Sequence, residues 1–273
     1  MITYFGLALG ALFITLPLYV AYVYKVSFIS KILSSFCKML VRVLLMGVVA
    51  YFLIKTGRIM LDILFAIALV VYSSLTVTVK VKLSALHFFV PVSAGILVSS
   101  LLVGSLLVFA NVSIGPGFGE RYVLPVFAIL SGGVVDAMAK SIEVYYMGLR
   151  YHNHLYYYML GNGVSRSDAL DYLMKRAMEK ALIPGIRKMS SVAVGASPVV
   201  MWTMITCGMS VFDATAWQVL LVLALYASSV LSVWISLIVV RKYMVDSYSR
   251  IKCQPQDEEE NNQIKEEINE QII

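Results

Sequence analysis

Charged side chains are scarce in this sequence of 273 residues. Only 14% of the residues are Asp, Glu, Lys or Arg, whereas soluble globular domains carry about 25%. Hydrophobic residues make up 60%, and the mean hydropathy is +0.82. Because a bilayer core about 30 Å thick takes about 20 apolar residues per helical span, this composition excludes an ordinary soluble domain. It predicts an all-α, polytopic membrane protein.

Cysteine is also rare, and the three cysteines, Cys37, Cys207 and Cys253, lie far apart in the chain. They form neither a disulfide framework nor a metal-binding spacing, so the sequence leaves any metal ligands unknown. The N-terminus lacks the basic segment of a signal peptide. We therefore expect residues 2–24 to be retained as a first membrane span.

A nucleotide-binding motif is missing as well. The glycine-rich stretch at residues 115–119 lacks the Lys-Ser/Thr ending of a P-loop and does not follow a strand. We interpret it as an external turn between two apolar runs. The chain is therefore expected to bind no cofactor and no ATP by itself, and to have no enzymatic activity of its own.

Long apolar runs predict about seven transmembrane helices. They cover residues 2–24, 37–55, 59–79, 87–110, 122–146, 183–208 and 215–240. Lys and Arg gather in alternate loops, and such basic loops stay in the cytoplasm, which predicts an external N-terminus and a cytoplasmic C-terminus. Since these loops meet anionic lipid headgroups, the formal charge of +6 does not indicate nucleic-acid binding.

Acidic residues concentrate in the last part of the chain. We expect a transmembrane domain over residues 1–252 and an acidic, disordered cytoplasmic tail over residues 253–273, because that tail is rich in Glu, Asn and Gln and poor in aromatic residues.

The cytoplasmic segment at about 147–182 is the one sizeable polar stretch before the tail. Ser165 followed by Asp168 has the form of a capping box, which predicts a helix that begins near Arg166. Apolar residues then recur at three- and four-residue steps and predict its buried face. They are Ala169, Leu170, Leu173, Ala177 and Ala181. We expect this helix to lead into the sixth span, with an interruption at Pro184 and Gly185.

These residues resemble a known family. The residues that carry the resemblance are Ser165-Arg-Ser-Asp-Ala-Leu, Arg176-Ala-Met-Glu-Lys-Ala-Leu-Ile-Pro184, Met189-Ser190, Pro198, Met201, Gln218 and Val239-Val240-Arg241-Lys242. They are similar to the pattern of FetB-type ABC transporter permeases, a family that includes iron-export permeases and plant aluminium-tolerance permeases. Two family motifs differ here, at Gly132-Gly133 and at residues 196–203.

The resemblance implies a permease that exports iron-like metal ions or confers metal tolerance. It implies a homodimer that pairs with a separate ABC ATPase subunit, so that ATP acts through that partner. It also implies a location in the plasma membrane, which is the inner membrane in a bacterium. The implied docking residues for the ATPase are Gly161, Ser165, Asp168, Ala169, Tyr172 and Arg176.

The fifth predicted span contains Asp136, Lys140 and Glu143 at steps of four and three, so they share one helix face. Ionisable residues inside a membrane mark transport paths, because a buried charge must face protein or water. The alternative is that Asp136 pairs with Lys140 and that Lys140 and Glu143 extend to the cytoplasmic interface. Pro198 and Met201 complete the candidate path, as a hinge and as a soft ligand or packing residue.

Two other functions remain open on the sequence. A seven-helix receptor would share the predicted topology, and a membrane-embedded enzyme would need paired catalytic groups inside the bilayer. His152 and His154 resemble a ligand pair, but the neighbouring tyrosines favour an interface with headgroups or with the ATPase.

Overall fold

The computed structural model describes residues 29–81, 85–111, 123–151, 153–191 and 198–244, with residues 15, 19, 23 and 24. Most of the predicted first span at 2–24, the turn at 115–119 and the acidic tail at 253–273 lie outside the described residues. All regular elements within the described ranges are α-helices. The chain divides into two compact units, Met1–Arg58 and Ile59–Ile273.

The described part of the first unit is dominated by helix α3, Ile29–Thr56. It stops at Gly57, whose φ of 59° lies in the left-handed region that glycine adopts without strain. The Gly57 N–H donates to the Leu53 carbonyl oxygen at 3.0 Å and so satisfies one of the last helical acceptors.

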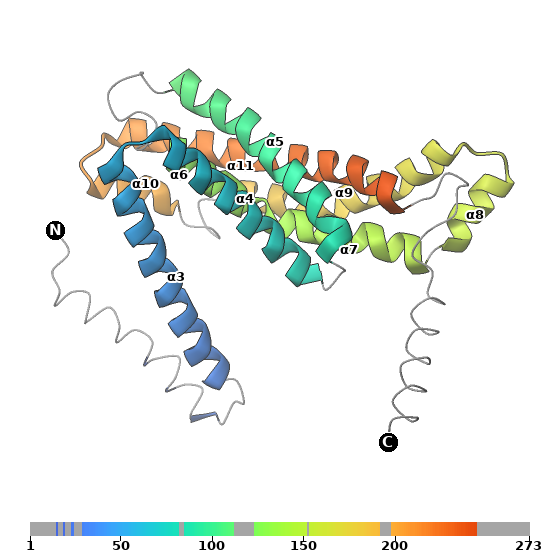
Figure 1. Cartoon of the computed structure of the whole chain (residues 1–273), viewed down its shortest axis with the longest axis horizontal. Coiled ribbons are helices and arrows are strands. Elements are labelled where there is room, and N and C mark those ends of the chain that lie inside the picture. The colour runs from blue at the N-terminus through green and yellow to red at the C-terminus, as the bar shows by residue number, and fades with distance from the viewer. Residues whose placement is uncertain are drawn as a thin grey trace. The chain divides into compact units, whose positions relative to one another are not determined.

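Eight described helices form the second unit (Figure 1). They are α4 (Ile59–Val81), α5 (Ala85–Asn111), α6 (Leu124–Gly133), α7 (Val135–Tyr151), α8 (Asn153–Gly161), α9 (Arg166–Ser190), α10 (Val199–Thr206) and α11 (Val211–Met244). Across both units, five described stretches are long and apolar enough to cross a membrane, with α6 and α7 counted together. These five agree with five of the seven predicted spans, and the chain is an all-α polytopic membrane protein.

Small residues let α5 and α11 pack closely along much of their length (Figure 1). The Ser236 hydroxyl donates to the Pro91 carbonyl oxygen at 2.9 Å, and the Ser228 and Ser99 hydroxyls lie 3.4 Å apart. A Cβ atom on Gly95 would lie 2.7 Å from the Ser232 carbonyl oxygen. Close approach through glycine and serine is typical of helix pairs in membranes, where lipid gives no hydrophobic drive for association.

Helix α9 differs from the prediction. It continues through Pro184 to Ser190, so the expected interruption at Pro184 and Gly185 is wrong. A proline removes one backbone donor, but α9 packs along both α7 and α11, and this packing supports a continuous helix despite the lost bond. The predicted sixth span at 183–208 is therefore divided between the end of α9 and α10, and the eight residues of α10 are too few to cross a bilayer. Residues 192–197, between them, lie outside the described residues.

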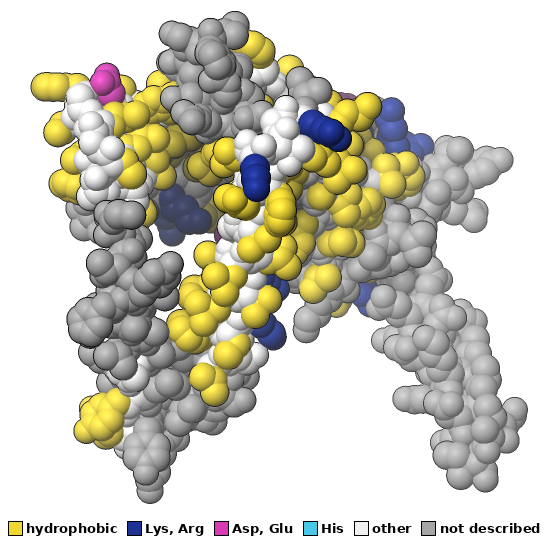
Figure 2. All heavy atoms as spheres, turned by 60° about the vertical axis from the view of Figure 1, so that its left-hand side comes forward, with side chains coloured by type: hydrophobic (Ala, Val, Ile, Leu, Met, Phe, Trp, Pro, Cys, Tyr) yellow, Lys and Arg dark blue, Asp and Glu magenta, His cyan; other side chains and the backbone are white. Residues whose placement is uncertain are grey.

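The predicted buried face of α9 is confirmed. Ala169, Leu170, Leu173, Ala177 and Ala181 are all buried, and all but Ala181 belong to the main core of the second unit. The outer surfaces of α4, α5 and α11 carry exposed apolar side chains, such as Ile63, Leu106 and Phe212. Figure 2 shows hydrophobic side chains over much of the described surface on one face, as expected for helices that meet lipid.

Candidate functional site

The polar face of α7 is the centre of the candidate path. Asp136, Lys140 and Glu143 lie on one face of the helix, as predicted from their spacing. The Nζ atom of Lys80, in the last turn of α4, lies 2.6 Å from Oδ1 of Asp136. The alternative in which Asp136 pairs with Lys140 is not seen, since Lys140 pairs with Glu143 at 3.0 Å. The Lys80 contact could not be predicted from local spacing, because Lys80 and Asp136 are 56 positions apart in the chain.

A pocket of about 370 Å³ lies between α7, α9 and α11, next to this face. Its polar lining comes from Asp136 and Lys140 of α7, Lys188 of α9, and Gln218 and Tyr226 of α11. Because Tyr226 is near the midpoint of α11, the pocket lies level with the middle of that apolar helix. Lys80 lies in the last turn of α4, so the Asp136 side of the pocket is near the end of that span.

The charges in this pocket do not cancel within the described residues. Asp136 is engaged by Lys80 and Lys140 by Glu143, whereas Lys188 has no ion-pair partner among the residues that the structure describes. The side chains of Lys80 and Asp136 are 48% and 72% exposed. Charged groups between apolar helices need water or another polypeptide beside them, which makes the pocket the candidate for a functional site in the described unit.

The turn between α8 and α9 has a defined geometry. The Val164 N–H donates to the Met159 carbonyl oxygen, and the Gly163 N–H donates to that of Leu160, both at 3.0 Å. These two bonds form a Schellman motif, in which Gly163 adopts a φ of 81°. The motif makes a tight turn at residues 161–163, which sets the direction in which α9 leaves α8.

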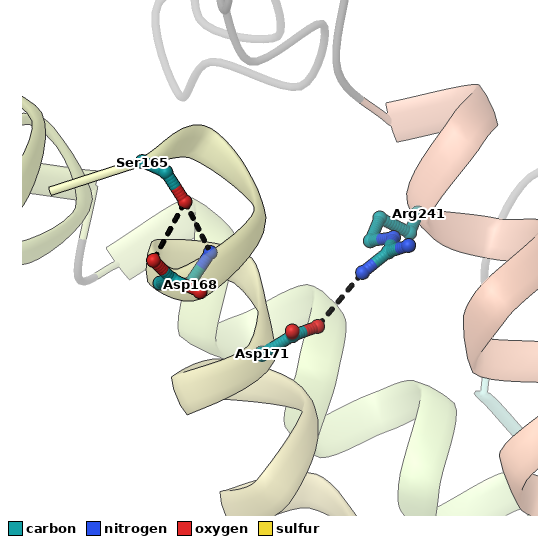
Figure 3. A network of polar contacts seen from close by, with 4 residues as sticks. All are labelled: Ser165, Asp168, Asp171 and Arg241. Atoms are coloured by element: carbon teal, nitrogen blue, oxygen red, sulfur yellow. Dashed lines mark hydrogen bonds and ion pairs between the residues drawn. The ribbon is translucent and has the colours of Figure 1, made fainter.

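The cap of α9 follows at once (Figure 3). The backbone N–H of Asp168 donates to the Ser165 hydroxyl oxygen at 3.2 Å, which confirms the predicted N-cap. The Asp168 carboxylate accepts from that same hydroxyl at 2.7 Å. The capping box therefore closes between the two side chains, and not through the Ser165 backbone as expected.

One further ion pair ties α9 to α11. Oδ1 of Asp171 accepts from Nη1 of Arg241 at 2.7 Å, and the two side chains point toward one another in Figure 3. In the sequence, Arg241 was noted only among the residues that carry the family resemblance. Its partner could not be read from the sequence, since the two residues belong to helices that are separated along the chain.

The predicted docking residues are distributed unevenly between surface and core. Gly161, Ser165, Asp168, Tyr172 and Arg176 are exposed. Ala169 is completely buried, so in this conformation it packs inside the unit and offers no surface to a partner. Only the five exposed residues are therefore accessible to a partner in this conformation.

Pro198 and Met201 lie apart from the lining of the Asp136 pocket. Pro198 immediately precedes α10, and the Met201 N–H donates to Oε1 of Gln218 at 3.2 Å. The Thr215 hydroxyl also approaches Sδ of Met201 at 3.5 Å. These contacts hold α10 against α11. Gln218 also lines the Asp136 pocket, so it connects Met201 with that pocket.

Metal ligands do not cluster in the described part of the chain. Nowhere among these residues do three His, Cys, Asp or Glu side chains come close enough to hold a metal ion. His154 is exposed on α8, and His152 lies outside the described residues.

Comparison with known proteins gives one match. The model of the uncharacterised protein family UPF0014 matches residues 4–245, and this match is consistent with a membrane permease of the ABC transporter type. No curated protein and no solved structure is similar to the chain. Because the family model covers most of the sequence, the chain belongs to the uncharacterised protein family UPF0014.

Proposed function

We propose that this chain is the permease subunit of an ABC transporter in the plasma membrane, which exports metal ions and is powered by a separate ATPase. The family match and the polytopic membrane fold support a transport subunit over a catalytic enzyme. The metal substrate follows the resemblance to FetB-type permeases.

The observation that carries the proposal is the continuity of α9. Its capped N-terminus, at Ser165, is exposed, and its last turns line the Asp136 pocket through Lys188. At 1.5 Å per residue, the helix spans about 37 Å. A single rigid element therefore connects a surface that an ATPase can contact with a polar pocket at the depth of the membrane, and such an element transmits rigid-body movement from one to the other.

The docking half of the proposal is tested by co-expression of this chain with an ABC ATPase from the same genome. The double variant Asp168→Lys with Tyr172→Ala changes two exposed side chains of α9 that lie four residues apart on one face. We expect it to lose co-purification with the ATPase from solubilised membranes. Ser167→Lys is the matched control, because it places the same ammonium group one position earlier and about 100° around the helix.

Retention of the ATPase by the double variant would show that this face of α9 is not the docking surface. Equal loss with Ser167→Lys would point to general disturbance of the helix start. The amount of full-length chain in the membrane is measured in parallel, so that a failure to fold is recognised.

A further inference from the structure

A second pocket, of about 270 Å³, lies between α7 and α9, beyond the Asp136 pocket along α7. Its charged lining consists of Lys140 and Glu143 from α7 and of Arg176 and Lys180 from α9. Lys140 and Glu143 neutralise one another at 3.0 Å. Arg176 and Lys180 have no carboxylate within ion-pair distance in the part of the chain that the structure describes, so the pocket carries an excess of two positive charges.

The rest of this pocket is apolar. Val144, Met147 and Leu173 line it, and Gly148 leaves space where a side chain would come within 3.4 Å of Leu173 Cδ2. A ligand that fits must therefore offer negative charge to one part of the pocket and an apolar group to the other. A small inorganic anion would leave the apolar part unfilled.

The position of the pocket along the helices indicates the source of such a ligand. Gly148 lies against Leu173, two residues from Asp171, which in turn binds Arg241 at the end of the apolar α11. Tyr151 lines this pocket, and together with Tyr158 it also lines a neighbouring hollow on α8. Tyrosine and basic residues at the end of an apolar helix are typical of the headgroup layer of a membrane. The pocket thus lies where lipid phosphates are found.

We propose that the pocket between α7 and α9 binds an anionic phospholipid, with Arg176 and Lys180 on its phosphate and with its acyl chain along Val144 and Met147. Two basic groups that converge on one anion supply charge-assisted hydrogen bonds, and guanidinium binds phosphate oxygens in a bidentate manner. The lipid would fill the gap between α7 and α9 in the leaflet that faces the cytoplasm in the predicted orientation. Binding of the lipid would require neither an ATPase nor a transported substrate.

The test uses the purified full chain in detergent without any ATPase, titrated with phosphatidylglycerol or with zwitterionic phosphatidylethanolamine and followed by native mass spectrometry. We expect tighter binding of phosphatidylglycerol to the wild-type chain. Arg176→Gln and Lys180→Gln should each weaken it by about fivefold, the effect of one basic residue at an anionic headgroup. Lys180→Arg keeps the positive charge, so we expect it to bind phosphatidylglycerol about as tightly as the wild-type chain. Lys175→Gln is the matched control, because Lys175 is an exposed lysine of the same helix that lines a different hollow, beside Asp171 and Glu179.

Three results would overturn the proposal. The first is equal binding of the two lipids by the wild-type chain, a comparison that needs no variant to fold. The second is an equal effect of Lys175→Gln and Lys180→Gln, which would indicate a diffuse attraction to basic residues. The third is displacement of the lipid by millimolar inorganic phosphate, which would make a soluble phosphate the ligand.

Discussion

Asp171, in the second turn of α9, and Arg241, in the last turn of α11, form an ion pair with 2.7 Å between Oδ1 and Nη1. Their side chains are 47% and 29% exposed, so solvent screens the pair, and we expect its contribution to stability to be below about 1 kcal/mol. Its larger effect should be on the position of α9 relative to α11.

The first prediction concerns this pair. Asp171→Arg places two cations together and should lower the thermal unfolding temperature in detergent by a few degrees and reduce the transport rate. The exchange Asp171→Arg with Arg241→Asp should recover most of both losses, because attraction is restored with the same two groups. A double-mutant cycle on the unfolding temperature measures the coupling. Additive effects of the two changes would contradict a direct interaction.

The second prediction tests whether Asp136 acts in transport or serves only as the ion-pair partner of Lys80. Asp136→Ala should lower metal tolerance of the host at normal membrane expression, because Lys80 then loses its ion-pair partner and the pocket lining keeps Lys140 and Lys188 without a carboxylate. The exchange Lys80→Asp with Asp136→Lys keeps the ion pair but moves the carboxylate out of α7. We expect it to restore the amount of folded protein but not tolerance.

Asp213→Ala serves as the control for this experiment, since Asp213 is an exposed carboxylate at the start of α11, away from the pocket lining. Unchanged tolerance in Asp136→Ala would leave the pair a structural feature only. Full recovery of tolerance in the exchanged variant would lead to the same conclusion.

The third prediction concerns the close approach of α5 and α11. Gly95→Ala should destabilise the unit by about 1–3 kcal/mol, since the added methyl group overlaps the Ser236 hydroxyl and the Ser232 backbone. Gly104→Ala on the same helix is the control, because its methyl group would lie 3.4 Å from Leu130 Cδ1, at ordinary contact distance. The unfolding temperature in detergent compares the two. Similar values would mean that α5 and α11 are not packed as closely as described.

The fourth prediction concerns the start of α9. Ser165→Ala removes the acceptor of the Asp168 amide and the donor to its carboxylate, and loss of such a cap costs about 1 kcal/mol. Hydrogen exchange of the amides in the first turn should therefore become about fivefold faster. Ser167→Ala, at the neighbouring exposed position, should leave exchange almost unchanged. Equal protection in both variants would contradict the cap.

Local patterns in the sequence predicted much of this fold correctly. The Ser165 cap and the buried face from Ala169 to Ala181 both depend on residues within a few positions of one another. Apolar runs likewise predicted the five spans that the described helices match, although several helices extend beyond the predicted ends.

Contacts between distant segments could not be predicted in the same way. Asp136 could have paired with Lys140 by helical spacing alone, but the packing of α4 against α7 brings Lys80 closer. Pro184 was expected to interrupt its helix, because local propensity does not include the support that α7 and α11 give to α9. Ala169 was expected at a partner surface because of its resemblance to a family motif, whereas the apolar period already placed it on the buried face.

The unbroken course of α9 has a mechanical consequence. About 30 Å of helix separates Asp168 from Lys188 at 1.5 Å per residue. A tilt of about 10° at the exposed end would shift the Lys188 end by about 5 Å, close to the 5.4 Å pitch of one helical turn. A small angular change at the surface would thus become a displacement of several ångströms at the pocket. Had the chain bent at Pro184, the same tilt would have been absorbed before it reached Lys188.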